Sequence, residues 1–108
     1  MNKTSEATAL AFKEGKKRTL SNTSVLVKDG EVLFRLFGRV IARRKCKTSI
    51  LLLNDSGWRV PTTKLRLNCI LKYYDSPVYI KQTKGMWHLS DGREWKCNED
   101  NLFNFEEQ

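Results

Sequence analysis

A chain of 108 residues with 40% hydrophobic and 10% aromatic residues has enough apolar material for one packed domain and no room for a second. Its formal net charge of +8 arises entirely in residues 1–48, which hold 12 Lys or Arg against 4 Asp or Glu, whereas residues 49–108 hold 8 of each. Such an excess of positive charge favours an acidic partner. Apolar runs such as Ile50–Leu53 are far shorter than the roughly 20 residues of a membrane-spanning helix, which excludes a membrane protein. The three cysteines cannot all pair, which indicates reduced thiols in a cytosol.

The first expected element is a short helix that ends at Glu14. Thr4 or Ser5 can cap its N-terminus, and Gly15 provides the stop. Its apolar stripe is narrow, so we expect this helix to dock only weakly. Residues 1–18 therefore form an N-terminal helix and a basic segment of the domain, because Lys16, Lys17 and Arg18 follow the negative end of the helix dipole.

A run of strands follows this helix. Asp29-Gly30 predicts a hairpin whose two-residue turn requires positive φ. Gly38 predicts a bend or a bulge after the hairpin. The expected strands are Ser24–Lys28, Glu31–Phe37, Arg39–Arg44 and Thr48–Leu53, after a loop over Leu20–Thr23.

Pro61 and the threonines that follow it predict the start of a second helix, Thr63–Tyr74. Apolar residues occupy a broad arc of this helix, which indicates that it is largely buried on a sheet. Arg66 lies within the apolar arc. We expect its side chain to reach solvent, to pair with a carboxylate or to line a pocket.

The last third of the chain returns to the alternation of strands. Val78–Thr83 and Met86–Leu89 flank a Lys84-Gly85 turn, and Arg93–Lys96 is a possible short last strand. This order predicts a single α+β domain over residues 1–108, a curled antiparallel sheet of about five to seven strands with one main helix packed on it and a short N-terminal helix. Residues 98–108 form an acidic tail.

The sequence contains no recognisable catalytic or metal-binding motif. His88 is the only histidine, and no cysteine lies in a nucleophile motif. Cys46, Cys69, His88 and Cys97 lack the paired C-x-x-C spacing of structural zinc sites. There is also no Walker A or dinucleotide-binding motif. We therefore expect a non-enzymatic protein that uses no cofactor or metal.

The strongest positive feature is the basic first half. If its clusters converge in space, they form a stripe that tracks phosphates; the alternative is a solvated sheet edge whose charges prevent aggregation. The start of the second helix offers a further anion site, unless Thr62 or Thr63 caps the helix and Trp58 covers its first turn. The candidate nucleic-acid contacts are Lys13, Lys16, Lys17, Arg18, Arg39, Arg43, Arg44 and Lys45, with Arg59, Lys64 and Arg66 as a second group.

Aromatic residues near cations can add stacking to such contacts. Tyr79, Trp87 and Trp95 lie close in sequence to lysine and arginine residues of the last hairpin. Trp87, however, shares its strand face with Leu89, which favours burial of the indole. The prediction of nucleic-acid binding therefore depends on charge more than on aromatic rings.

Several motifs together resemble a known family. Residues 57–68, GWRVPTTKLRLN, match a G-W-x-T-x-T-T-K-x-R-L-N pattern, and further matches lie at residues 11–16, 22–25, 36–42 and 80–87. This set resembles small uncharacterised proteins of tailed phages and prophages. The chain departs from the pattern at Phe37-Gly38-Arg39, where that family has His-Gly-Asn, and at Val60, where it has Thr. The resemblance implies a viral origin and the host cytoplasm as location, without a mechanism.

Two functions remain open. One is nucleic-acid binding, DNA or RNA, mainly through phosphate contacts. The alternative is a protein-binding modulator or inhibitor whose basic face docks on an acidic surface of a host or defence protein. In either case the acidic tail can fold back over the basic face and screen it.

Overall fold

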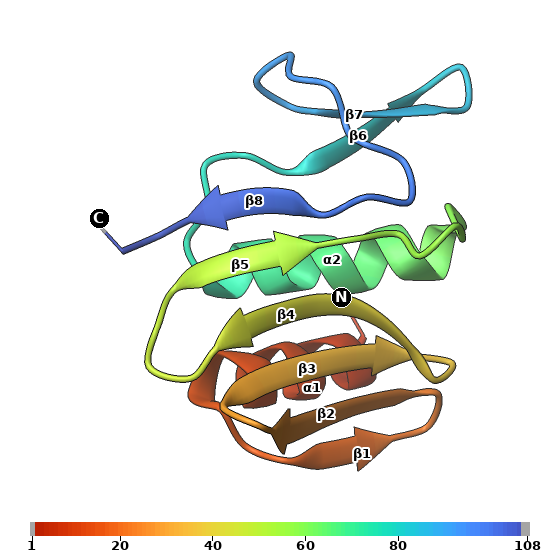
Figure 1. Ribbon diagram of the computed structural model, residues 1–108. Helices are drawn as coiled ribbons and strands as arrows, with labels where there is room; N and C mark the ends of the chain where they lie inside the picture. The colour runs from red at the N-terminus through yellow and green to blue at the C-terminus, as the bar shows by residue number, and fades with distance from the viewer. Residues whose placement is uncertain (1, 107–108) are drawn as a thin grey trace.

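A computed structural model describes residues 2–106 (Figure 1). The fold is α+β, which confirms the predicted class. The elements in chain order are α1 (Lys3–Glu14), β1 (Arg18–Leu20), β2 (Thr23–Lys28), β3 (Glu31–Leu36), β4 (Arg39–Lys45), β5 (Ile50–Leu53), α2 (Pro61–Tyr73), β6 (Ile80–Thr83), β7 (Met86–Leu89) and β8 (Asn101–Asn104).

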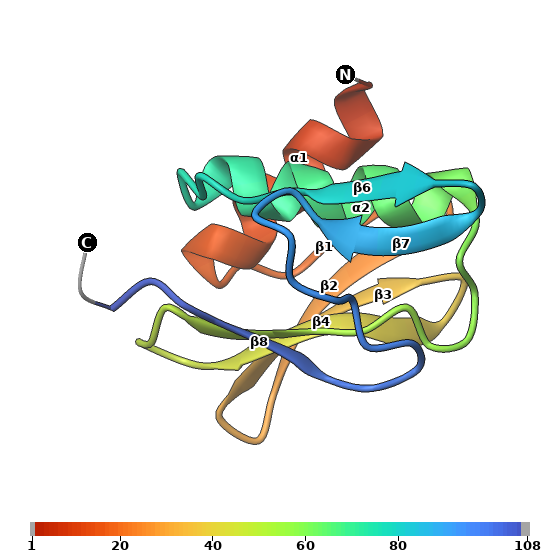
Figure 2. The same ribbon diagram turned by 90° about the horizontal axis from the view of Figure 1, so that it is seen from above.

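The architecture has two layers. Six antiparallel strands form a sheet in the order β1-β2-β3-β4-β5-β8, and β6 and β7 form a separate hairpin. Helices α1 and α2 lie on one face of the sheet, with the β6–β7 hairpin beside α2 (Figure 2). Within residues 2–106, no helix or strand covers the opposite face, which we call the open face (Figure 2). The core therefore fills the space between the sheet and the helices.

Helix α1 packs more firmly than the sequence suggested. The side chain of Asn2, not that of Thr4 or Ser5, caps the helix by accepting a hydrogen bond from Ser5 N at 2.8 Å. Gly15 ends the helix in the left-handed conformation, as predicted. Phe12 is fully buried and makes an edge-to-face contact with Phe34 at 6.0 Å. The expectation of weak docking was wrong because small residues such as Ser5 and Thr8 are also buried along this helix.

Tight turns connect the first strands. Asp29-Gly30 forms the predicted turn, with φ of 52° and 78°. Phe37-Gly38 is a second turn of the same kind, with φ of 51° and 77°, and not the expected bend. The irregularity lies instead between Phe34 and Arg35, at a register shift opposite β4. The expected loop at residues 20–23 is also wrong in part, because Leu20 belongs to β1 and pairs with Thr23 of β2.

The acidic tail is part of the sheet. Within it, β8 pairs with β5 along its whole length and buries Phe103. Sequence analysis missed this strand, because its partner lies about fifty residues earlier in the chain and acidic residues surround it. The possible strand Arg93–Lys96 reduces to one bridge, between His88 and Glu94. Residues 107 and 108 of the predicted tail lie outside the described residues.

Candidate nucleic-acid interface

Arg44 is one of the predicted contacts, and its side chain is buried. Only 7% of the residue is exposed, because Arg44 lies on the helix side of β4. Its guanidinium donates to the carbonyl oxygens of Phe12 and Lys13, both at 2.9 Å from Nη2, and to that of Thr48 at 3.2 Å from Nη1. Arg44 therefore binds the end of α1. A nucleic-acid contact must lie on the surface, and Arg44 does not.

Arg66 is buried as well, with 5% of the residue exposed. Its guanidinium donates to the hydroxyl oxygens of Thr23, at 3.0 Å, and of Ser5, and to Asn22 Oδ1 at 3.3 Å. No ion pair joins it to a carboxylate within residues 2–106, so the alternative of pairing with a carboxylate is not realised there. Burial lowers the pKa of Arg66 from its ordinary value. The residue links α2 to α1 and β2, and it too is absent from the surface.

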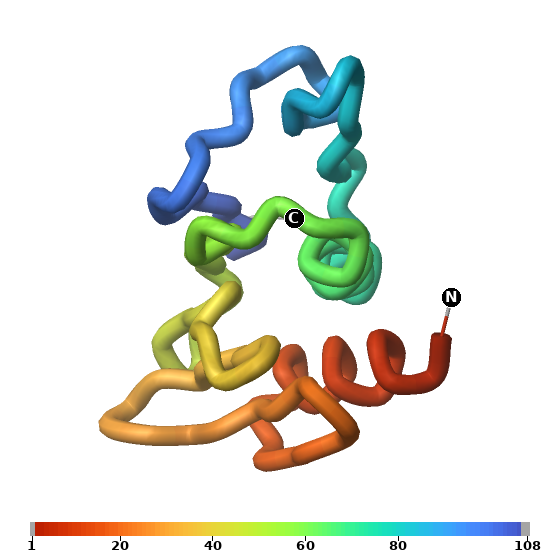
Figure 3. The backbone as a smooth tube through the Cα atoms, turned by 90° about the vertical axis from the view of Figure 1, so that its right-hand side faces the viewer, coloured from red at the N-terminus to blue at the C-terminus, as the bar shows by residue number. Residues whose placement is uncertain are grey.

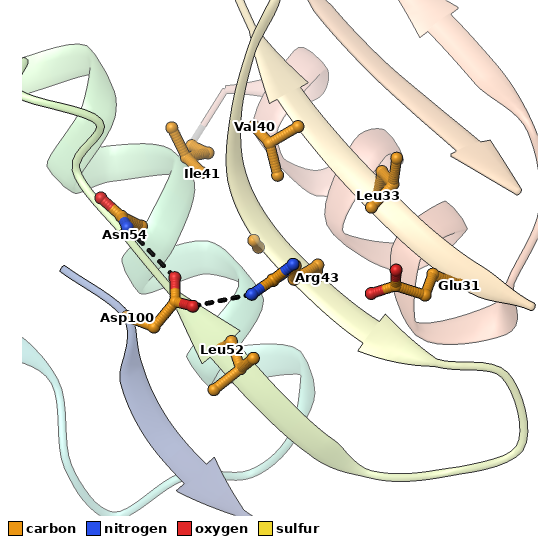
Figure 4. Close-up of a pocket in the computed structure, with 9 residues that line it drawn as sticks. Glu31, Leu33, Val40, Ile41, Arg43, Leu52, Asn54 and Asp100 are labelled. Atoms are coloured by element: carbon orange, nitrogen blue, oxygen red, sulfur yellow. Dashed lines mark hydrogen bonds and ion pairs between the residues drawn. The ribbon is translucent and has the colours of Figure 1, made fainter. Parts of the chain in front are cut away.

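Lys13 and Arg43 bind groups of the protein itself. Lys13 Nζ donates to the carbonyl oxygen of Tyr73 at 2.8 Å, at the end of α2. Arg43 Nη2 forms an ion pair with Asp100 Oδ2 at 2.8 Å, and Asn54 Nδ2 donates to the other oxygen of that carboxylate at 3.1 Å (Figure 4). The hydrogen bonds from Asn54 and Arg43 hold the pKa of Asp100 below its ordinary value. The tail thus neutralises Arg43.

Most of the remaining predicted residues separate to the two ends of the molecule. Arg39 begins β4 and Lys45 ends it, so a whole strand lies between them. Lys16 and Lys17 lie at the Lys45 end, where Glu14 and Glu31 are interspersed. The clusters therefore do not converge, and the predicted continuous stripe is not formed. Lys16, Lys17 and Lys45 are exposed at one end; Arg39, Arg59 and the half-buried Lys64 lie at the other. Arg18 is exposed on the edge strand β1, level with the middle of β4.

We call the end of the molecule that carries Arg39, Arg59 and Lys64 the aromatic end. Three turn-containing segments meet there, 37–39, 56–64 and 82–86, at the right-hand side of Figure 1, which faces the viewer in Figure 3. Arg39 Nη1 donates to Ser56 O at 3.3 Å, and Lys64 Nζ donates to Gln82 Oε1 at 3.1 Å. A hollow of about 290 Å³ is lined by Arg59 of the second segment and Met86 of the third. Residues far apart in sequence thus form one surface.

Aromatic rings and arginine are in contact on this surface. The Arg39 guanidinium lies 4.2 Å from the centre of the Trp58 ring, and the Phe37 ring lies 6.1 Å from the same indole. Phe37 is 55% exposed and Trp58 42%. Exposed rings beside cations can stack on nucleobases and attract phosphates. The three segments contain no Asp or Glu, so no carboxylate of theirs opposes this attraction.

A buried carboxylate holds the loop that carries Trp58. Asp55 is fully buried and accepts hydrogen bonds from Gly57 N at 2.7 Å, Asn98 N at 3.0 Å and the indole nitrogen of Trp95 at 2.8 Å. The loop leads into α2 without the predicted threonine cap: the N-cap residue, Val60, makes no side-chain cap hydrogen bond. Asp55 therefore sets the position of Trp58 and Arg59.

Sequence reasoning missed Phe37 and Asp55 and assigned Trp58 to covering the helix. A signal for Phe37 was present, because the alternation of the strand puts residue 37 out of phase with the buried apolar positions 32, 34 and 36. The aromatic residues considered earlier are different: Trp87 and Trp95 are buried with their ring centres 5.7 Å apart and their planes tilted by 56°, whereas Tyr79 is exposed. The expected burial of Trp87 is confirmed.

Three further observations concern membrane spans, metal ligands and cysteines in residues 2–106. No helix in that range is long and apolar enough to cross a membrane. The same residues contain no group of three or more His, Cys, Asp or Glu placed to hold one metal ion. Cys46, Cys69 and Cys97 form no disulfide there.

Comparison with known proteins identifies a family for this chain. A family model described as Kyanoviridae Gp96 protein matches residues 1–107. No curated protein and no solved structure matches the chain. The resemblance to phage proteins is confirmed at the level of a phage protein family. The chain belongs to the Kyanoviridae Gp96 family of phage proteins.

Proposed function

We propose that this protein is a non-enzymatic binder of single-stranded nucleic acid in the cytoplasm of the infected host, and that the aromatic end is its contact surface. One observation supports this above all others. Exposed Phe37 and Trp58 lie beside Arg39 at the meeting point of three segments that have cations and no carboxylates. That combination provides both a stacking surface and phosphate contacts.

Each group on this surface has a distinct role. The rings of Phe37 and Trp58 offer exposed area on which bases stack, and stacking on a protein aromatic contributes about 1–3 kcal/mol per base. Arg39 holds the indole through the cation–π contact and leaves part of its own charge for a phosphate. Arg59, Lys64 and Lys84 belong to the same three segments, and we assign them to neighbouring phosphates.

A single strand fits this surface better than a duplex. Duplex binding without sequence readout depends on a continuous basic track, and the cations of this chain lie at two separate ends. Stacking requires unpaired bases, which only a single strand presents in full. The exposed cations at the Lys45 end add long-range attraction and no direct contact in this proposal.

The test is a binding titration with labelled oligonucleotides, for example a thymidine strand of about 15 nucleotides and a matched duplex, over about 50 to 200 mM salt. We expect the single strand to bind more tightly, with affinity that falls as salt rises. Trp58→Ala should weaken binding about tenfold, from the lost stacking. Arg59→Ala should reduce the salt slope by about 1.

Matched controls come from the rest of the surface. Tyr79→Ala removes an exposed aromatic ring outside the aromatic end, and Lys17→Ala removes an exposed cation at the opposite end. Both variants should bind like the wild type. Binding that does not depend on salt, or equal losses for Trp58→Ala and Tyr79→Ala, would contradict the proposal.

A further inference from the structure

Leucines form a row across the open face of the sheet. The strand register places Leu26 opposite Leu33, Leu33 opposite Arg43, Arg43 opposite Leu52, and Leu52 opposite Leu102. We call these five residues the leucine row. Except for the exposed Val27, their neighbours in sequence point to the helices and are buried, for example Phe34 and Leu53. The row therefore faces away from the core, and Leu102 is 60% exposed.

Two hollows lie along this row. The first, of about 360 Å³, is lined by Leu33, Val40 and Leu52 around Arg43, together with the carboxylates of Glu31 and Asp100 (Figure 4). The second, of about 420 Å³, is lined by Ile50, Leu52 and Leu102 together with Lys45. Val40 and Ile50 are both 36% exposed. An apolar strip with hollows on an uncovered sheet face is typical of a protein-binding surface.

The charges around the row are mainly positive. Arg35 lies one row away on one side, opposite Val40. On the other side lie Lys28 and Lys45, both opposite Glu31. The charge of Arg43 within the row is balanced by Asp100, so Glu31 opposes the three cations Arg35, Lys28 and Lys45. The charges around the leucine row thus fit an acidic partner.

The same charges disfavour a second copy of the chain as occupant. In a face-to-face dimer each patch meets itself, so the cations of one copy approach those of the other. Like charges in contact across an interface oppose association, and the chain as a whole carries +8. The occupant is therefore better sought in a different protein.

We propose that the leucine row docks one amphipathic helix of a partner protein, with leucine-like residues at helical spacing and acidic residues on both flanks. The row crosses five strands, a span of about 19 Å at the usual strand spacing. A helix of about 13 residues has that length. Apolar anchors at i, i+3 or i+4 and i+7 would enter the hollows. This inference does not rest on nucleic-acid binding, because the row and the aromatic end are separate surfaces.

The test uses the full chain and synthetic helical peptides of about 14 residues. The peptides share one leucine face and differ only in their flanks, which are glutamate, glutamine or lysine. Binding is followed by methyl NMR. We expect the glutamate peptide to shift the leucine-row methyl signals, and the lysine peptide to bind about tenfold more weakly.

Variants locate the contact. Leu102→Ser should weaken binding of the glutamate peptide about fivefold. Ile50→Ser, a second variant in case the first affects β8, should weaken this binding by the same factor. Leu10→Ser is the matched control, since Leu10 is 41% exposed on α1, on the other side of the sheet, and it should bind like the wild type. All three should bind the oligonucleotide like the wild type.

Several results would overturn the proposal. One is the absence of glutamate-peptide binding at millimolar concentration. Others are equal affinity for the glutamate and lysine peptides, or shifts confined to residues outside the row. A concentration-dependent dimer that Leu102→Ser abolishes would assign the row to a second copy instead.

Discussion

The guanidinium of Arg44 donates two hydrogen bonds to the carbonyl oxygen of Phe12, at 2.9 Å from Nη2 and 3.3 Å from Nε. The carbonyls at the C-terminus of a helix lack partners within the helix and carry partial negative charge, so a cation there is stabilising. The same guanidinium lies 5.6 Å from the centre of the Phe12 ring. One positive charge of the basic first half of the chain therefore attaches α1 to the sheet.

Replacing Arg44 should destabilise the fold. Arg44→Met keeps much of the side-chain volume and leaves buried carbonyl oxygens without donors, so we expect the free energy of unfolding to fall by about 3 kcal/mol. Arg43→Met is the control, because Arg43 forms a half-exposed ion pair and should cost less than about 1 kcal/mol. Urea unfolding of both variants measures the difference. Similar losses would show that Arg44 does not hold α1.

Replacing Asp55 should affect both stability and binding. Asp55→Ala leaves the indole N–H of Trp95 and the amides of Gly57 and Asn98 without their acceptor, and we expect a loss of about 3 kcal/mol in unfolding free energy. Oligonucleotide affinity should also fall, because the loop that carries Trp58 loses its support.

The control for Asp55 is Asp91→Ala. Asp91 is exposed and pairs with its neighbour Arg93 at 2.7 Å. Its replacement should leave both the urea midpoint and the oligonucleotide affinity unchanged. A stable Asp55→Ala variant with wild-type affinity would contradict the role assigned to this carboxylate.

The sequence predicted the features that depend on neighbouring residues. The Asp29-Gly30 and Lys84-Gly85 turns and the helix that begins near Pro61 follow from local backbone preferences, and all three are confirmed. Pairing between distant strands is not local. Arg43 and Arg44 are adjacent and identical, yet one faces solvent and the other the core, because the register of β4 against β3 decides their faces.

The candidate site was only partly predictable for the same reason. Arg39 and Arg59 were named from charge alone. Their association with exposed aromatic rings requires the β3–β4 turn and the loop before α2 to meet at one end of the sheet, as the contact of Arg39 with Trp58 shows. A charge total along the chain contains no such information.

Two glycines provide a matched test of the aromatic end. Gly38 and Gly30 are the second residues of equivalent turns, with φ of 77° and 78°, and a Cβ on either would meet no atom within 4 Å. Alanine at each position should therefore cost about 1 kcal/mol, from backbone strain alone. Only Gly38→Ala should weaken oligonucleotide binding, because its turn carries Phe37 and Arg39. Equal binding by the two variants, at equal stability, would remove this turn from the contact surface.

The last prediction concerns acid and the tail. The pKa of Asp100 lies below its ordinary value of 3.8 because Asn54 and then Arg43 donate to the carboxylate. The ionised form is thus favoured in the folded state, so its contribution to stability is full above the unfolded pKa and is lost as the pH falls through the lower, folded pKa. Between about pH 5 and pH 2, the wild type should therefore lose more stability than Asp100→Asn.

Urea midpoints measured at successive pH values check this difference. Glu99→Gln serves as the control in the same segment, since Glu99 makes no ion pair among residues 2–106, and it should keep the wild-type profile. Because the side chain of Asp100 is 38% exposed, added salt should also reduce the gap between wild type and Asp100→Asn at neutral pH. If the two profiles run parallel down to the lowest pH, the ion pair with Arg43 does not hold β8 on the sheet, and the pairing of β8 with β5 depends on the backbone hydrogen bonds, the bond from Asn101 to Leu53 O and the burial of Phe103.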